Sequence, residues 1–187
     1  MSDLVLYHSP GSRSGRVKAL LDLMKVPYTI VEVDLKSGAN KKPEYLAIHP
    51  LGKVPALKHG KQVIIESGAI MLYLADLYPE AEMAPPPGSP ERGRYYEWFL
   101  LSLATFEPAA MNAFQNPDNA DAQANLKTML RILDARLGEP YAMGNALTAV
   151  DVLVHGQLAF MANMGRLEDL PRAKAYYERL KNKIPDA

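Results

Sequence analysis

The stretch His49–Ser67, HPLGKVPALKHGKQVIIES, decides the fold of this 187-residue chain. Two short apolar runs, VPAL and VII, flank the turn-like Lys58-His59-Gly60, a pattern that predicts a β-hairpin. Proline in the first run indicates an edge strand or the start of a strand. The apolar helical pattern GAIMLYLADLY begins right after Glu66-Ser67. The stretch therefore predicts a strand entered through Val54-Pro55, a hairpin, and a helix that begins at Ser67.

The residues before this hairpin have the pattern of a β-α-β unit. Leu4–Tyr7 is typical of a short buried strand, and residues 28–33 alternate as a second strand does. Between them, apolar side chains at positions 17, 20, 21 and 24 follow the spacing of an amphipathic helix. With a short helix expected over residues 43–47, the order is β-α-β-α-β-β-α. This order predicts a thioredoxin-like α/β domain over residues 1–78.

The rest of the chain is expected to be helical. Residues 79–90 contain Pro85, Pro86, Pro87 and Gly88 and predict a stiff linker. Residues 91–114 predict one long helix or a kinked pair, because Pro108 falls inside the pattern. Further helices are expected around the leucines of residues 126–137, after residue 148, and over residues 171–183. The fold class is therefore a thioredoxin-like α/β N-terminal domain followed by an all-α C-terminal domain, residues 91–187.

The helix after residue 148 carries a start signal and an unusual composition. Thr148 and Asp151 have the spacing of a capping box, with Asp in the place of the usual Glu or Gln. The helix that follows, AVDVLVHGQLAFMANM, is apolar on nearly every side. A helix of this kind belongs in the middle of a bundle. We therefore interpret Asp151 as a structural residue.

Composition excludes several classes of function. The chain has 21 basic and 21 acidic residues, so its net charge gives no indication of nucleic acid or an anionic membrane as a partner. It has no cysteine, which excludes disulfides and catalysis by a protein thiol. Its four histidines are too dispersed in the sequence for us to predict a metal site. With no signal-peptide or membrane-spanning pattern in the sequence, a cytoplasmic protein is expected.

The hairpin and the following helix start also suggest a ligand. A cis Val54-Pro55 bond would leave the Val54 amide and carbonyl free to pair with a peptide. A helix that begins at Ser67 would attract a carboxylate through its unpaired N–H groups and its dipole. A small peptide with a carboxylate at one end fits this arrangement. The alternative from the residues alone is an edge hairpin and an N-cap serine that bind nothing.

HPLGKVPAL followed by IIESGAIMLYLADLYP resembles the glutathione-binding half of the cytosolic glutathione transferase family, and the capping box at Thr148 is a third matching motif. The resemblance covers nearly the whole chain. It implies glutathione as co-substrate, a small hydrophobic electrophile as second substrate, and a homodimer. The implied reaction is attack of the bound glutathione thiolate on the electrophile. Alternatives are a glutathione-dependent isomerase or peroxidase, and a non-catalytic binding module of the same fold.

The resemblance also assigns residues to each part of the tripeptide. It implies that Lys53 pairs with the glycine carboxylate and that the backbone of Val54, before Pro55, pairs with the cysteinyl peptide. Ser67 and its helix amide would bind the γ-glutamyl carboxylate, and Glu66 would orient the neighbouring ammonium. Each side chain also has an interpretation without a ligand: Lys53 as a solvated surface lysine, Glu66 as a partner of the helix dipole, and Ser67 as a helix cap.

The first loop offers four hydroxyls as possible donors to the glutathione thiol, those of Tyr7, Ser9, Ser12 and Ser14. In the serine-type branch of the family the donor lies just before the first helix, where this chain has Ser12. In the tyrosine-type branch it ends the first strand, where this chain has Tyr7. We favour Ser12 and keep Tyr7 as the alternative. The cysteine-type position holds Arg13, and we expect Ser14 to cap the helix.

The helix over residues 91–114 has two further expected roles. Many relatives lend an aspartate from this helix to the glutathione site of the partner subunit, but here Glu97 and Glu107 are the only interior acids, so the sequence departs from the family pattern at this contact. The candidates for lining the electrophile pocket are Phe106, Met111 and Phe114, with Tyr95 or Tyr96 at its polar edge; the alternative is that this stripe is simply core.

Overall fold

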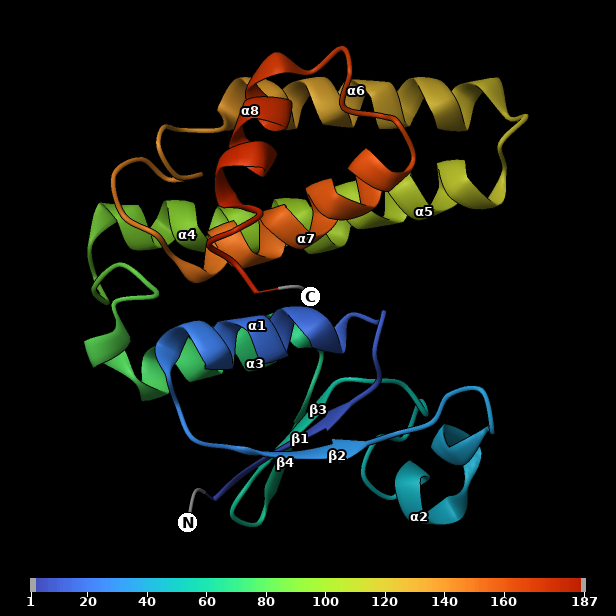
Figure 1. Ribbon diagram of the computed structural model, residues 1–187, viewed down its shortest axis with the longest axis vertical. Coiled ribbons are helices and arrows are strands. Elements are labelled where there is room, and N and C mark those ends of the chain that lie inside the picture. Colours follow the sequence, from blue (N-terminus) through green and yellow to red (C-terminus); the bar gives the residue numbers. More distant parts are fainter. Residues whose placement is uncertain (1–2, 186–187) are drawn as a thin grey trace. The chain divides into compact units, whose positions relative to one another are not determined.

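The computed structural model describes residues 3–185 and divides into two compact units, Met1–Glu82 with Ile184–Ala187, and Met83–Lys183. The first unit is a mixed α/β domain and the second contains only helices (Figure 1). The predicted fold class is therefore confirmed. Each unit is described below by itself.

The first unit is built on a four-stranded mixed sheet of order β2-β1-β3-β4. β1 is parallel to β2 and antiparallel to β3, and β3 and β4 form the predicted antiparallel hairpin. The strands are β1 Leu4–His8, β2 Thr29–Glu32, β3 Ala56–His59 and β4 Gln62–Ile65. All four elements lie where the sequence pattern predicts strands.

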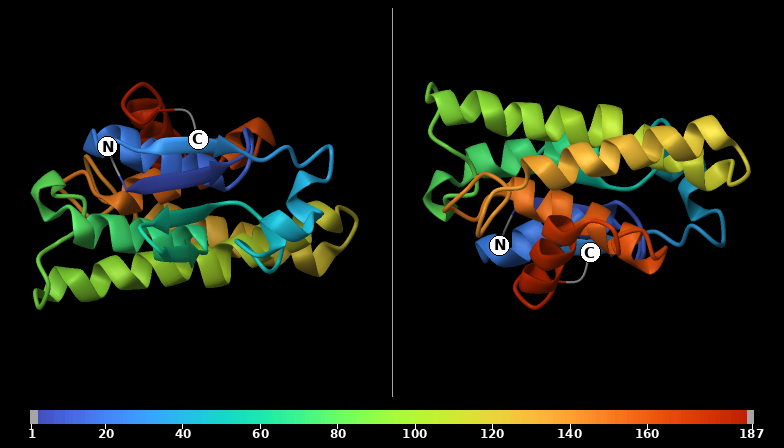
Figure 2. Two further views of the ribbon diagram at one scale, coloured as in Figure 1. Left: turned by 90° about the horizontal axis from the view of Figure 1, so that it is seen from below. Right: turned by 90° about the horizontal axis from the view of Figure 1, so that it is seen from above.

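Helices α1 (Ser14–Met24) and α3 (Ser67–Leu77) lie side by side along one face of this sheet (Figures 1 and 2). Their apolar stripes bury the side chains that the helical spacing indicated, and these meet the inward-facing residues of β1 and β3. The fully buried set is Leu4, Leu6, Val17, Leu20, Leu21, Leu57, Ile70, Met71 and Leu74. Helix α3 ends before Pro79, because the residue before a proline disfavours helical backbone. Two short elements, η1 (Ala39–Lys41) and α2 (Pro43–Leu46), precede β3.

The chain enters the second unit through η2 (Pro79–Ala81) and a proline-rich segment that is fastened to the helices. The Met83 carbonyl accepts a hydrogen bond of 2.8 Å from the Ala149 N–H. The Arg92 guanidinium donates one of 2.8 Å to the Pro85 carbonyl. These contacts hold residues 83–89 against the start of the bundle.

The first long helix of the second unit is interrupted before Pro108. Helix α4 (Pro90–Leu100) passes into a π-helical segment, η3 (Leu101–Phe106), and then into α5 (Glu107–Gln115), as one rod (Figure 2). Proline cannot donate to the carbonyl four residues earlier and its ring clashes there. The wider π turn accommodates this break. The remaining helices are α6 (Ala120–Arg136), α7 (Ala149–Asn163) and α8 (Pro171–Leu180), of which the last ends three residues before the predicted end at 183.

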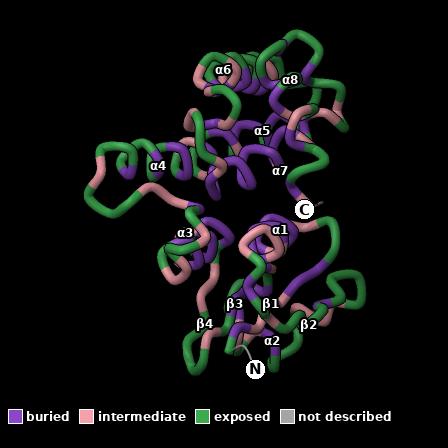
Figure 3. The backbone as a smooth tube through the Cα atoms, turned by 60° about the vertical axis from the view of Figure 1, so that its left-hand side comes forward, coloured by how far each residue is buried: buried purple, intermediate pink, exposed green. Residues whose placement is uncertain are grey.

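Helix α7 forms the centre of the second unit, as its composition predicted. Residues on all sides of it are buried, from Ala149 to Met161, and Figure 3 colours its trace by this burial. Trp98 of α4, Leu130 of α6 and Tyr176 of α8 are buried as well. An all-round apolar helix can be stable only when neighbours cover each side of it.

Asp151, at the start of α7, joins three segments of the second unit. The predicted capping box with Thr148 is present. One carboxylate oxygen accepts from the Thr148 N–H at 2.8 Å and the Thr148 hydroxyl at 3.2 Å; the other accepts from the Ala142 N–H and the Tyr176 hydroxyl, both at 2.7 Å. Burial raises the pKa of the Asp151 carboxyl above its usual range, and the four donors oppose that shift. Every polar contact of this side chain is structural.

Candidate functional site

The strand register brings the ends of three strands together at one end of the sheet. Tyr7 of β1 lies opposite Ala56 of β3, and Ala56 lies opposite Ile65 of β4. The loop of residues 9–13 follows β1, the Val54-Pro55 pair precedes β3, and Glu66 with Ser67 follows β4. All the residues proposed from the sequence therefore gather at this end, namely Tyr7, Ser12, Lys53, Val54, Pro55, Glu66 and Ser67.

The Val54-Pro55 peptide bond is cis. Pro55 is buried and Val54 is half-buried. The paired register of β3 begins at Ala56, so the backbone of Val54 lies outside the ladder. The N–H and C=O of Val54 therefore take no part in the ladder pairs of β3.

The two residues before Val54 are held by side chains from the preceding segment. The Asn40 side-chain amide donates to the Gly52 carbonyl at 2.6 Å, and the Tyr45 hydroxyl donates to the Lys53 carbonyl at 2.7 Å. Burial, and to a lesser extent Tyr7, raises the pKa of the Tyr45 hydroxyl to about 12, so this donor keeps its proton at neutral pH. The Lys53 side chain is exposed. The backbone is thus fixed while the ammonium remains accessible.

We expect Gly52→Ala to lower the free energy of unfolding by about 1–3 kcal/mol, because Gly52 has φ +58° and an added Cβ would lie 2.6 Å from the Asn40 carbonyl oxygen. Gly60→Ala is the matched control, since Gly60 has φ +56° and no atom within 4 Å of an added Cβ. Urea unfolding of both variants separates the clash from the cost of the left-handed backbone. Equal losses in the two variants would show that the contact with Asn40 is not tight.

Glu66 has an unusual backbone conformation directly before α3. Its φ of 70° and ψ of 116° lie outside the regions that non-glycine residues favour, and such strain persists where the surrounding structure holds it. Its side chain is exposed, whereas Ser67, the first residue of α3, is 5% exposed. A carboxylate ligand would meet the helix N-terminus at Ser67.

His49 is a neighbour of this region that the sequence interpretation passed over. It is 2% exposed, and burial lowers the pKa of its imidazole, with Glu66 raising it and Lys53 lowering it further. The ring therefore lies in the field of two residues proposed for ligand binding. The sequence feature that could have indicated His49 as a neighbour of the site is its position in HPLGK, three residues before Gly52.

Hydroxyl groups cluster in the loop between β1 and α1. The Ser12 Oγ lies 2.6 Å from the Ser14 Oγ, which lies 2.7 Å from the Nδ1 of His8. The Ser9 N–H donates to the Ser14 Oγ at 3.1 Å. Ser14 is fully buried and Ser12 half-buried. Ser12 is therefore the more accessible end of a buried polar chain.

The expectation that Ser14 caps α1 was wrong. The N-cap residue is Arg13, with no side-chain cap bond, and Ser14 is the first helical residue. It is Ser12 whose Oγ accepts the Ser14 N–H, at 3.2 Å. The hydroxyl of Ser14 instead faces back toward His8 and Ser9, because the loop folds over the end of β1.

Tyr7 makes a packing contact near the same end of the sheet. Its half-buried ring meets the ring of Tyr45 edge to face, with 5.9 Å between the centroids and 67° between the planes. Through Tyr45, whose hydroxyl binds the Lys53 carbonyl, this ring supports the segment before Val54.

Residues 3–185 contain neither a metal-binding cluster nor a membrane-spanning helix. That part of the chain holds no group of three or more His, Cys, Asp or Glu side chains placed to bind a metal ion. It also contains no helix both long enough and apolar enough to span a membrane.

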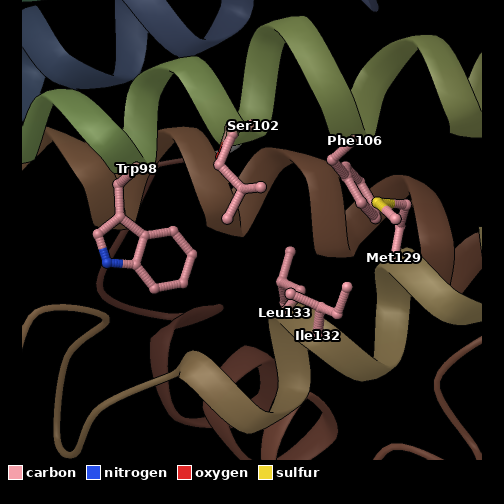
Figure 4. Close-up of a pocket in the computed structure, with 7 residues that line it drawn as sticks. Trp98, Ser102, Phe106, Met129, Ile132 and Leu133 are labelled. Carbon is pink, nitrogen blue, oxygen red and sulfur yellow. The ribbon is translucent and has the colours of Figure 1, made fainter. Parts of the chain in front are cut away.

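The second unit contains a small apolar cavity beside the π-helical segment. Side chains of α4, η3 and α6 line it (Figure 4): Trp98, Leu101, Ser102, Phe106, Met129, Ile132 and Leu133. Its volume of ≈ 10 Å³ holds about one water molecule, so it is too small for a substrate. Phe106 is buried at this cavity, whereas Met111 and Phe114 are 38% and 53% exposed. Phe106 is thus a core residue, and Phe114 pairs edge to face with Phe160.

The two interior acids of the first long helix are engaged within the second unit. Glu97 forms an ion pair of 2.7 Å with Arg136, and Glu107 accepts from the Gln157 side chain at 3.2 Å. These contacts give each acid a partner on another helix of the same bundle.

Comparison with known proteins identifies the family. The family model described as "Glutathione S-transferase, N-terminal domain" matches residues 2–76, and "Glutathione S-transferase, C-terminal domain" matches residues 108–179. Glutathione S-transferase 3 of Zea mays is 30% identical over 96% of this chain and 90% of its own length.

Solved structures agree with this assignment. A glutathione transferase from Methylococcus capsulatus is 30% identical, covers 96% of this chain and 93% of its own, and superposes with a TM-score of 0.85. A glutathione transferase homologue from Sulfitobacter, solved with bound glutathione, shares the fold at 22% identity, a TM-score of 0.78, and coverage of 98% and 94%. With both family domains matched in order and a relative aligned over almost its whole length, the chain belongs to the glutathione S-transferase family.

Proposed function

We propose that this protein is a glutathione transferase that binds glutathione at the end of its sheet and directs the thiolate at a small hydrophobic electrophile. The observation that carries the proposal is the meeting of an exposed Lys53, a Val54 backbone that lies outside the β3 ladder beside a cis proline, and the N-terminus of α3 at Ser67. Glutathione carries a carboxylate at each end and a peptide backbone between them. A cation, an open backbone edge and a helix N-terminus are complementary to those groups.

Each proposed contact is the one that the family resemblance implies, and the charge and accessibility of the residues support it. Lys53 is a point-charge partner for the glycine carboxylate, and Val54 pairs its N–H and C=O with the cysteinyl residue. Ser67 and the first amide groups of α3 bind the γ-glutamyl carboxylate. Glu66 is exposed beside them and attracts the adjacent ammonium. The glutathione bound to the Sulfitobacter homologue supports the same ligand for this fold.

Ser12 is the proposed donor to the glutathione sulfur. A free thiol has a pKa of about 8.5, and only the thiolate is a good nucleophile. A hydroxyl donor near a helix N-terminus favours the charged sulfur through both its hydrogen bond and the helix dipole. Ser12 is half-buried just before α1, whereas the ring of Tyr7 packs on Tyr45. Tyr7 remains the alternative donor.

We expect Ser67→Ala to weaken glutathione binding by about 1–3 kcal/mol, because a hydrogen bond to a charged carboxylate is lost. Titration calorimetry measures this difference. Ser37→Ala is the control, since the exposed Ser37 hydroxyl donates to the Asp34 carbonyl at 3.1 Å and is not among the residues proposed to bind glutathione. An affinity equal to that of the unmodified protein would remove Ser67 from the site, and no binding by the unmodified protein would overturn the proposed function.

Turnover separates a transferase from a module that only binds glutathione. The test is retention on immobilised glutathione, followed by an assay with a general aromatic halide and a panel of further electrophiles. We expect both retention and turnover. Retention without turnover of any electrophile would contradict the transferase assignment.

We further propose that the protein acts in the cytoplasm as a homodimer. The family resemblance supports both, and α4 presents large apolar side chains to solvent: Tyr96 is 44% exposed and Leu100 66% exposed.

Because Glu97 and Glu107 are engaged within their own bundle, we propose that the glutathione ammonium is bound without an acid from the partner subunit. Sedimentation equilibrium at several protein concentrations tests the dimer.

A further inference from the structure

A buried chain of polar groups links His8 to the accessible hydroxyl of Ser12. His8, at the end of β1, is 9% exposed, and its Nδ1 lies 2.7 Å from the Ser14 Oγ. The Ser14 Oγ lies 2.6 Å from the Ser12 Oγ. The Ser9 carbonyl is a second acceptor for both hydroxyls, at 2.7 Å from Ser12 and 3.1 Å from Ser14. The number of protons that these groups carry limits the directions in which they can donate hydrogen bonds to one another.

In the first orientation, His8 Nδ1 carries no proton and accepts from the Ser14 hydroxyl. A hydroxyl has one proton and two acceptor lone pairs. The Ser14 oxygen then accepts from the Ser9 N–H and from the Ser12 hydroxyl, which fills both lone pairs. The Ser12 proton points to Ser14, away from any ligand. To donate to a sulfur atom, Ser12 would first have to break this hydrogen bond.

In the second orientation, His8 Nδ1 carries the proton and donates to Ser14. The two lone pairs of the Ser14 oxygen are now filled by His8 and the Ser9 N–H. The proton in the 2.6 Å contact must then come from Ser14, so Ser12 accepts from Ser14 and keeps its own proton free. That proton can move from the Ser9 carbonyl to a ligand sulfur with the loss of this one hydrogen bond, while the contacts from His8 through Ser14 to Ser12 stay intact.

We infer that His8 is a positioning residue which, by donating from Nδ1 to Ser14, directs the hydroxyl proton of Ser12 toward the bound sulfur. The inference rests on the proposed role of Ser12 as the thiol donor. His8 does not touch the sulfur; it determines in which direction the serine pair donates. The same geometry without the Nδ1 proton would turn the donor away from the substrate.

The charges around His8 set when each orientation is available. Burial lowers the pKa of the His8 imidazole, Lys18 of α1 lowers it further, and Glu32, opposite His8 on β2, raises it. At neutral pH the ring is therefore neutral, and the choice lies between its two tautomers. A sulfur anion at Ser12 favours the tautomer that donates toward it. Below the lowered pKa the ring is protonated on both nitrogens and can only donate, so the productive orientation persists as the pH falls.

The titration of bound glutathione tests this arrangement. In His8→Leu and in Ser14→Ala we expect the pKa of the bound thiol, followed by the ultraviolet absorbance of the thiolate, to rise by about 0.5–1 unit. In His8→Asn we expect the pKa of the bound thiol to stay nearly as low as in the unmodified protein, since an amide N–H can occupy the Nδ1 position and does not titrate. His59→Leu is the matched control: His59 also contacts a hydroxyl through Nδ1, that of Tyr73 at 2.6 Å, and its loss should leave the thiol pKa unchanged.

The tautomer itself gives a readout that a merely structural role would not move. Nitrogen NMR of His8 in the complex with glutathione should show the Nδ1–H tautomer; the Nε2–H tautomer in that complex would overturn the inference. If Ser12→Ala raises the thiol pKa while His8→Leu and Ser14→Ala leave it unchanged, the inference falls and the proposed function stands. If the unmodified protein neither binds glutathione nor lowers its thiol pKa, both fall together.

Discussion

Asp151→Ala is expected to lower the free energy of unfolding by about 3–5 kcal/mol. The carboxylate is fully buried and accepts hydrogen bonds from two backbone N–H groups and two hydroxyls. Each donor left without a partner in the interior costs about 1–3 kcal/mol, and local relaxation recovers part of that sum. The donors come from the loop before α7, from its N-cap and from α8. Loss of Asp151 therefore loosens three segments at once.

Urea denaturation measures this effect, and two further variants define it. Asp121→Ala, at an exposed position in the first turn of α6, should change stability by no more than about 0.5 kcal/mol. Asp151→Asn keeps the shape of the side chain and one acceptor oxygen, but its amide group faces donors that it cannot accept from. We therefore expect a loss in the free energy of unfolding between those of the other two variants. Glutathione affinity of the folded protein should not change in any of the three. Normal stability with lost binding in Asp151→Ala would mean that this residue belongs to the ligand site.

Ser12→Ala is expected to raise the pKa of the bound thiol by about 1–2 units and to reduce turnover at neutral pH about 10- to 100-fold. The donor stabilises the thiolate relative to the thiol, so its removal leaves less thiolate at a fixed pH and moves the pH–rate curve to higher pH. Glutathione binding, through Lys53, Val54 and Ser67, should change little. Thiolate absorbance titrated with pH measures the shift directly.

Tyr7→Phe is the comparison that decides the donor. Its ring packs edge to face on Tyr45, and phenylalanine preserves that contact, so a small effect is expected. If Tyr7→Phe abolishes the thiolate at neutral pH and Ser12→Ala does not, the protein is of the tyrosine type. If neither variant moves the pKa, the dipole and backbone amides at the start of α1 are the main stabilising groups, and no single hydroxyl is catalytic.

Features that depend on local pattern were predictable from the sequence. The hairpin, the start of α3 at Ser67 and the capping box at Thr148 all lie where turn chemistry, hydrophobic periodicity and cap residues indicated. Each depends on residues within a few positions of one another. The central place of α7 also followed from its composition, because an apolar surface on every side must be covered.

Side-chain contacts between segments that are distant in sequence could not be predicted in the same way. The sequence indicated Thr148 as a partner of Asp151 but not Ala142 or Tyr176. The path of the loop before α7 brings Ala142 to the carboxylate, and Tyr176 reaches it because α8 packs on α7. The role of Ser14 was wrongly assigned because a serine before an apolar run predicts a cap, whereas the loop path brings His8 within 2.7 Å of its hydroxyl.

By itself, the sequence determined the order of elements and the residues at the end of the sheet, because these depend on spacing along the chain, and it indicated the family through the resemblance of its motifs. Tertiary structure alone decided that Asn40 and Tyr45 hold the carbonyls of Gly52 and Lys53, that Phe106 is buried, and that His8 completes a chain of hydrogen bonds to Ser12. The physical reason is that a side chain's partner depends on the path of segments distant in sequence. Only the packed backbone fixes which donor and acceptor come within hydrogen-bonding distance.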